Sequence, residues 1–197
     1  MDWPVAASNA FLLVAVATFV ASPMVGIAGG WRRLPFGLVV ATAAVMLGSF
    51  AVLALSWRKI PGGISAAVFG HLALIVSAVA LAGLGRFVRT LFDDRLTAAF
   101  AALTMSVIVV AGIFAMAPLT ENLSPASSHW LLLANPLVTV TSAAGIDLLH
   151  LDTIYRTSPL AHRGVVLPAW TTACVVFAFV GLAAFGASRL RPWSHQS

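Results

Sequence analysis

The chain has 197 residues, of which 60% are hydrophobic and 9% are charged, and its formal net charge at pH 7 is +5. Soluble domains carry about 25% charged residues, so this chain has too little polar surface to cover a water-soluble globule. The composition therefore predicts an all-α, polytopic integral membrane protein with a single membrane domain over residues 1–197. The basic residues are scattered between apolar stretches, which argues against a nucleic-acid partner and favours the lipid bilayer and its acidic head groups.

Five apolar stretches are long enough to cross the bilayer, because a spanning helix needs about 20 residues. They cover residues 10–28, 36–56, 64–84, 96–117 and 167–187, and none contains Asp, Glu, Lys or Arg. Gly, Pro, Trp and charged residues separate the first four stretches, as expected of loops at the membrane surface. The first stretch lacks the basic start of a signal peptide and exceeds the usual apolar core of about 7–15 residues, so it is predicted to be a retained helix.

The distribution of basic residues favours one orientation across the membrane. Seven arginines share one side: Arg32, Arg33, Arg86, Arg89, Arg95, Arg189 and Arg191. Four basic residues share the other side: Arg58, Lys59, Arg156 and Arg163. The positive-inside rule then predicts an N-terminus outside and a C-terminus in the cytoplasm, in a bacterial inner (cytoplasmic) membrane.

The segment 118–166 lies outside on this assignment and holds three of the six acidic residues and three of the five histidines. Asn135-Pro136 divides it, because the residue before a proline disfavours the helical region while proline suits a first helical turn. We expect one helix to end at Ala134 and a second to run from Pro136 to about Leu151, too short to cross the bilayer. The segment is therefore predicted to be a re-entrant or interfacial helix pair. Its candidate residues are Asn135, Pro136, Asp147 and His150.

His71 is the one histidine inside a predicted span. A haem within a helical bundle usually needs a second axial ligand on a facing helix. Four methionines could in principle supply it, but methionine in a membrane core normally fills space; they are Met24, Met46, Met105 and Met116. We therefore expect His71 to hydrogen-bond to a neighbouring helix or subunit.

The polar groups of the external segment match no familiar metal-ligand or catalytic spacing. They are Glu121, His129, Asp147, His150, Asp152 and His162, and we expect them to be solvated. The chain contains no P-loop, H-E-x-x-H or G-x-S-x-G pattern, so neither ATP binding by this chain nor a metalloprotease or hydrolase site is indicated. The sequence thus predicts no catalytic group, no metal and no cofactor, and a membrane-embedded enzyme is only a third alternative.

A short stretch from Gly85 to Arg95 joins the third and fourth predicted spans and mixes both signs of charge with two phenylalanines. Two interpretations stay open: a solvated turn, or a docking surface for a soluble partner on the cytoplasmic side. The candidate docking residues, with those of the first cytoplasmic loop, are Arg32, Arg33, Arg86, Arg89, Asp93, Asp94 and Arg95.

Several segments are similar to type-2 ABC exporter permeases. These are the run Gly85–Ala99, the Asn-Pro within Leu132–Val138, Pro168-Ala169-Trp170 before the last span, and Ser188–Pro192 at its end. The resemblance covers about residues 64–192 and implies a permease that dimerises, works with a separate ATP-binding subunit and carries an external helix pair after its penultimate span. The sixth span and the acidic coupling segment usual in that family have no counterpart here.

Two functions follow as expectations. The first is a permease-like subunit of an ABC-type transporter that needs a separate ATPase. The alternative is a non-catalytic scaffold or accessory subunit of a larger membrane complex, respiratory or photosynthetic, because small helix-packing residues abound and catalytic groups are lacking.

Overall fold

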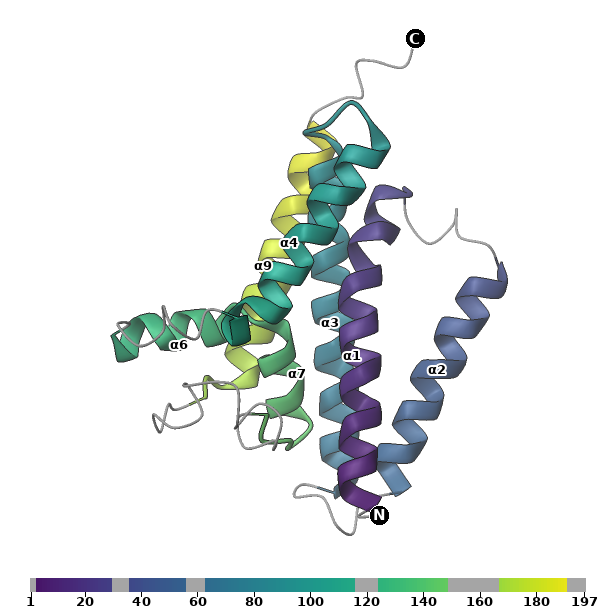
Figure 1. Ribbon diagram of the computed structural model, residues 1–197, viewed down its shortest axis with the longest axis vertical. Helices are drawn as coiled ribbons and strands as arrows, with labels where there is room; N and C mark the ends of the chain where they lie inside the picture. The colour runs from purple at the N-terminus through teal and green to yellow at the C-terminus, as the bar shows by residue number, and fades with distance from the viewer. Residues whose placement is uncertain (1–2, 30–35, 56–62, 116–123, 149–166, 191–197) are drawn as a thin grey trace.

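The computed structural model describes residues 3–29, 36–55, 63–115, 124–148 and 167–190. These residues form seven α-helices and no strand, so the predicted all-α class is confirmed. The helices are α1 (Trp3–Ile27), α2 (Phe36–Leu55), α3 (Gly63–Arg89), α4 (Arg95–Ala115), α6 (Pro125–Leu133), α7 (Pro136–Ala143) and α9 (Trp170–Leu190). Figure 1 shows α1, α3 and α9 running in one direction, with α2 and α4 running in the other.

Helix α3 occupies the centre of the bundle. It contacts α1, α2, α4, α7 and α9, and fourteen of its 27 residues are buried. Most of these buried residues are Ala, Gly or Ser. Burying apolar surface between helices gives no hydrophobic gain inside a membrane. Membrane helices therefore associate through close van der Waals packing, which small side chains permit.

The tightest contact of the bundle joins α1 and α3. A Cβ atom on Gly85 would lie 2.2 Å from the carbonyl oxygen of Pro23, and one on Gly26 would lie 2.0 Å from that of Ala82. The two backbones therefore touch, and only glycine fits at these two positions. The expectation that Gly85 starts a loop is wrong: α3 continues through Gly85 to Arg89.

Three helices have the length and apolar character needed to span a membrane. Within the described residues they are Val5–Ile27, Gly63–Arg89 and Trp170–Leu190, while Thr42–Leu55 and Arg95–Ala111 are shorter apolar stretches. Three of the five predicted spans thus have spanning length, and a membrane protein is indicated. Their bounds differ from those predicted, since α1 begins at Trp3, seven residues before residue 10, and α9 ends at Leu190, three residues after residue 187.

Helix α2 is the least embedded of the long helices. It contacts α1 and α3, and its buried residues from 42 to 55 are Ser49 and Leu53. Figure 1 shows that the first half of α2 diverges from α1. The predicted stretch 36–56 forms the helix Phe36–Leu55, in which Thr42–Leu55 is one of the shorter apolar stretches.

The helices α6 and α7 meet at Asn135, as predicted. Figure 1 shows α6 projecting sideways from the bundle and α7 running along it, and α7 contacts α3 and α9. The expectation that α7 extends to about Leu151 is wrong, because α7 ends at Ala143. Gly145 adopts a left-handed conformation with φ 67°, and Ile146 N–H donates to Thr141 O at 2.8 Å. This is the Schellman arrangement that stops helices.

We predict that Gly85→Ala destabilises the protein while Gly48→Ala does not. The new methyl group at position 85 would collide with the backbone of α1, and overpacking of this kind costs about 1–3 kcal/mol. Gly48 also lies within a helix, but nothing lies within 4 Å of the added carbon. Thermal unfolding in detergent, followed by circular dichroism, measures both variants. Equal melting temperatures for Gly85→Ala and wild type would contradict the close α1–α3 contact.

Candidate functional site

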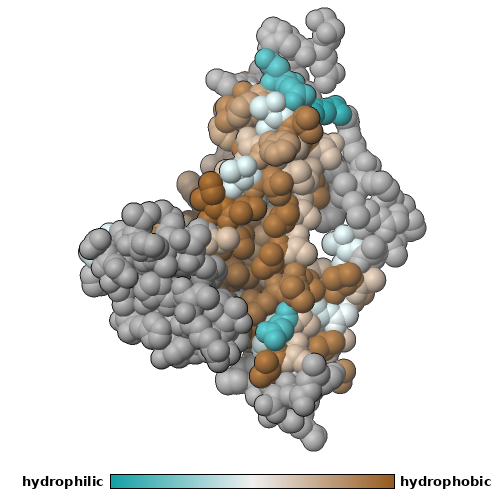
Figure 2. All heavy atoms as spheres, in the orientation of Figure 1, coloured by the Kyte–Doolittle hydropathy of each residue, from teal (hydrophilic) through white to brown (hydrophobic). Residues whose placement is uncertain are grey.

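The charged residues of three helix ends gather at one end of the molecule. Arg86 and Arg89 lie in the last turn of α3, Arg95 begins α4, and Arg189 lies in the last turn of α9. Figure 1 shows these three helix ends together at the top of the bundle, and Figure 2 shows hydrophilic surface there above a largely hydrophobic face. We call Arg86, Arg89, Arg95 and Arg189 the basic end.

The structure brings five of the seven predicted docking residues to this end. They are Arg86, Arg89, Asp93, Asp94 and Arg95. Arg32 and Arg33 lie outside the described residues. Sequence reasoning assigned Arg189 to the same side of the membrane but left it out of the docking set. Its assignment to the same side as Arg86 and Arg89 was the signal available in the sequence.

The turn between α3 and α4 is held by local hydrogen bonds. The Arg89 guanidinium donates to Phe92 O, and Asp94 caps α4 by accepting from Thr97 N at 2.7 Å and Thr97 Oγ1 at 2.9 Å. The backbone N–H of Thr97, more than its hydroxyl, holds the pKa of the Asp94 carboxyl below its ordinary value. A carboxyl whose pKa is lower in the folded than in the unfolded protein stabilises the fold while it is ionised. This stabilisation is lost as the pH falls through the pKa of the carboxyl in the folded protein. Asp94 is therefore ionised at neutral pH.

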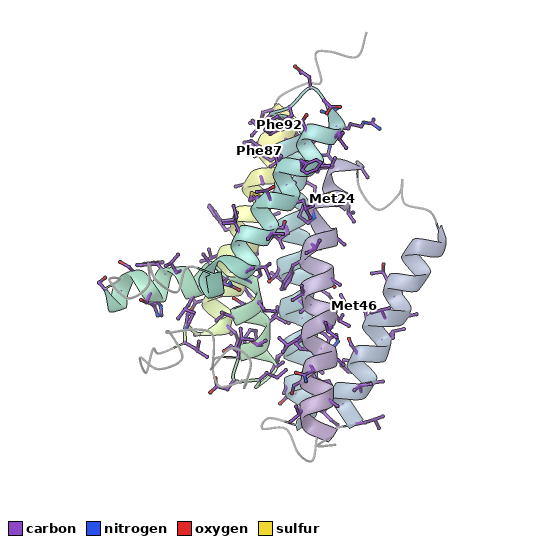
Figure 3. The ribbon with its side chains drawn as sticks, in the orientation of Figure 1. Met24, Met46, Phe87 and Phe92 are labelled. Carbon is purple, nitrogen blue, oxygen red and sulfur yellow. The ribbon has the colours of Figure 1, made fainter. Side chains whose placement is uncertain are left out.

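Apolar side chains are exposed within this charged turn. Leu91 and Leu96 are exposed, and Phe92 keeps 36% of its surface accessible. Figure 3 shows Phe87 and Phe92 at this end of the bundle, beside the turn. Exposed apolar groups rimmed by charge are typical of a surface that receives another protein.

Arg86 connects the ends of α3 and α9. Its guanidinium carbon lies 5.8 Å from the centroid of the Phe185 ring, within the range of a cation–π interaction. Gly83 allows this approach, because a Cβ there would lie 2.9 Å from the Phe185 ring. Phe185 was not among the predicted site residues.

His71 is a structural link between α2 and α3, as predicted. Its Nε2 lies 2.8 Å from Ser49 Oγ and its Nδ1 lies 2.9 Å from Ala67 O. A carbonyl oxygen only accepts, so Nδ1 carries a proton and donates to Ala67. The rings of Phe11 and Phe50 pack on the imidazole with centroids at 5.1 and 5.3 Å. Ser49 and the two phenylalanines are distant in sequence and gave no signal.

The methionines considered as partners of His71 act as packing groups where they are described. Met46 packs against the main core and lies between α2 and α1 (Figure 3). Met24 and Met105 pack in a separate cluster with Ile27 and Val88, and Met116 lies outside the described residues. Within the described ranges, no three His, Cys, Asp or Glu residues are grouped so as to hold a metal ion.

Asn135 joins α7 to α4. Its Oδ1 caps α7 by accepting from Leu137 N at 2.8 Å and Val138 N at 3.2 Å. Its Nδ2 donates to Val109 O at 3.0 Å and Val110 O at 3.1 Å. The buried amide is thus fully bonded and serves to position α7 rather than to bind a ligand.

The other predicted residues of the helix pair have different places. Pro136 is buried in the first turn of α7, as expected. Asp147 was placed on the helix by sequence reasoning, but it lies four residues past the end of α7 and is exposed. His150 lies outside the described residues. The pair therefore does not bring together a cluster of acidic and imidazole groups within the described part of the chain.

We predict that Asn135→Ala lowers the free energy of unfolding by about 2–3 kcal/mol, because it removes a cap and the two hydrogen bonds that join α7 to α4. Ser124→Ala, at the exposed cap of α6, is the matched control and should cost about 0.5–1 kcal/mol. Asn135→Ser keeps an N-cap oxygen but lacks the amide that donates to α4. Denaturation in mild detergent compares the three variants, and a stability of Asn135→Ser equal to wild type would show that the link to α4 contributes nothing.

Comparison of the chain with known proteins gives no match: no protein-family model, no curated protein and no solved structure matches it. The function of the chain is therefore inferred from the residues of the basic end, from their exposure and from their position on the bundle.

Proposed function

We propose that this chain is the membrane-spanning, permease-like subunit of an ABC-type transporter, working with a separate ATP-binding subunit. The observation that carries the proposal is the basic end, where the α3–α4 turn presents Leu91 and Phe92 among charged groups. A soluble ATP-binding subunit needs an exposed contact surface on the cytoplasmic side, and this turn supplies one. The similarity of residues 64–192 to type-2 ABC exporter permeases supports the same function.

The proposal includes five membrane spans, with α2 and α4 crossing beside α1, α3 and α9. Helix α2 has 20 residues and α4 has 21, and at a rise of 1.5 Å per residue each is about 30 Å long, the thickness of the hydrocarbon layer. The alternating direction of the five helices agrees with this topology (Figure 1). It places the basic end in the cytoplasm and the start of α1 outside.

The same topology places α6 and α7 in the outer half of the membrane as a re-entrant or interfacial pair. The eight residues of α7 are too few to cross. Buried contacts with α3 and α9 and the bonds of Asn135 shield its backbone, which is the condition for non-spanning structure at membrane depth. Trp130 of α6 is 66% exposed, as suits a residue at the interface.

Phe92→Ala should weaken binding of the ATP-binding subunit. Aromatic groups at interfaces commonly contribute about 2 kcal/mol or more, so we expect roughly thirty-fold weaker binding. Phe100→Ala is the matched control, because Phe100 is 66% exposed on α4 below the turn and would face lipid. The measurement is recovery of the ATP-binding subunit with the tagged chain after purification in mild detergent.

Equal recovery with Phe92→Ala and wild type would show that the turn is not the docking surface. Recovery of a haem- or pigment-bearing complex without any ATP-binding subunit would refute the transporter proposal. The chain would then be a scaffold or accessory subunit of that complex.

A further inference from the structure

A hollow of about 280 Å³ opens on the surface between α3 and α9, and every residue that lines it is apolar. Its floor is the crossing of Gly181 and Ala80, where a Cβ on Gly181 would lie 2.7 Å from Ala80 Cα. Ile75 and Val79 of α3 and Leu182 of α9 form exposed walls. The hollow exists because small residues at the crossing stand between large ones on either side.

Positively charged side chains lie next to one end of the hollow. Phe185 lines it, and the guanidinium of Arg86 lies over the same ring, 5.8 Å from its centroid. Arg189 follows Phe185 by one turn and so lies on the same face of α9. Neither α3 nor α9 contains an acidic residue. The nearest acidic residues along the chain are Asp93 and Asp94 in the following turn, and Asp94 is bonded to Thr97.

The distance along α3 from the far end of the hollow to Arg86 matches the thickness of one leaflet of a bilayer. Ile75 and Arg86 are eleven residues apart on one helix, which corresponds to about 16 Å of rise. Half of the hydrocarbon layer is about 15 Å thick. A molecule whose charged group met Arg86 would therefore lay its apolar part along the hollow within the same leaflet.

We propose that this hollow binds one anionic phospholipid, with an acyl chain between α3 and α9 and its phosphate head group at Arg86 and Arg189. The apolar lining fits a hydrocarbon chain, and two arginines at its end favour a head group with net negative charge over a zwitterionic one. The head-group site uses Arg86 and Arg189 of the basic end, whereas the proposed docking surface is the exposed turn at Leu91 and Phe92, so lipid binding does not depend on an ATP-binding partner.

Native mass spectrometry of the detergent-purified full chain tests the proposal, with phosphatidylglycerol or phosphatidylcholine of identical acyl chains added. We expect phosphatidylglycerol to bind more tightly. Ala178→Phe fills the hollow from an exposed wall position and should weaken binding of both lipids by about tenfold. Arg86→Gln should weaken phosphatidylglycerol alone, by about fivefold.

Two matched controls separate the site from general effects. Ala183→Phe adds the same ring on an exposed residue of α9 that does not line the hollow, and Arg95→Gln removes a charge from the neighbouring helix. Both should bind lipid as wild type does. Equal binding of the two lipids to wild type, unchanged binding by Ala178→Phe, or equal losses in Ala178→Phe and Ala183→Phe would each overturn the proposal. If Ala178→Phe converted a dimer to monomers and left lipid binding unchanged, the hollow would belong to a second copy of the chain.

Discussion

Direct backbone contact between α1 and α3 is the constraint on which the remaining packing depends. At Gly26 and Gly85 the two helices approach so closely that no side-chain carbon fits between them. In a bilayer, helices associate through shape rather than through escape from water. Helix α1 packs on one side of α3, and α9, α7, α4 and α2 contact its other sides. Helix α3 continues past Gly85, and Arg86 and Arg89 lie in its last turn, beyond the apolar span.

A few polar side chains within the bundle link helices, and most of the others bond to carbonyl groups of their own helix. His71 joins α3 to α2 through Ser49, Asn135 joins α7 to α4, and Thr141 bonds to the carbonyl groups of its own helix. Within the described residues, the Ser77 hydroxyl is buried without a partner, and the structure offers no physical account of it. Because these groups bond within the bundle, the features open to a ligand or partner lie on the surface, at the basic end and in the hollow between α3 and α9.

Sequence patterns located most helices because they report local properties. A long uncharged apolar run predicts a spanning helix whatever its neighbours are, and Asn135-Pro136 marks a helix break through the local geometry of proline. Gly85 and Gly145 show where this logic fails. Gly85 was predicted to begin a loop, whereas the helix from Pro136 was predicted to continue past Gly145 to about Leu151. Gly145 does end α7, whereas Gly85 lies inside α3 because another helix packs on it.

Features that join distant segments could not be predicted from the sequence. The partner of His71 is 22 residues away on another helix, and the approach of Arg86 to Phe185 depends on how α3 and α9 cross. The charged composition of the α3–α4 turn was visible in the sequence. Arg189 was predicted to lie on the same side of the membrane, but the position of the α9 end next to this turn follows from the arrangement of the helices (Figure 1).

The side of the membrane on which the basic end lies tests the central claim most directly. Leu91→Cys in a Cys174→Ala background places one thiol at an exposed position of the turn. Labelling by a membrane-impermeant maleimide, compared between inverted and right-side-out vesicles, then reports the side. The proposed function predicts labelling in inverted vesicles alone, since the turn must face the cytoplasm to meet an ATP-binding subunit. Labelling in right-side-out vesicles alone would place the turn outside and contradict the transporter proposal.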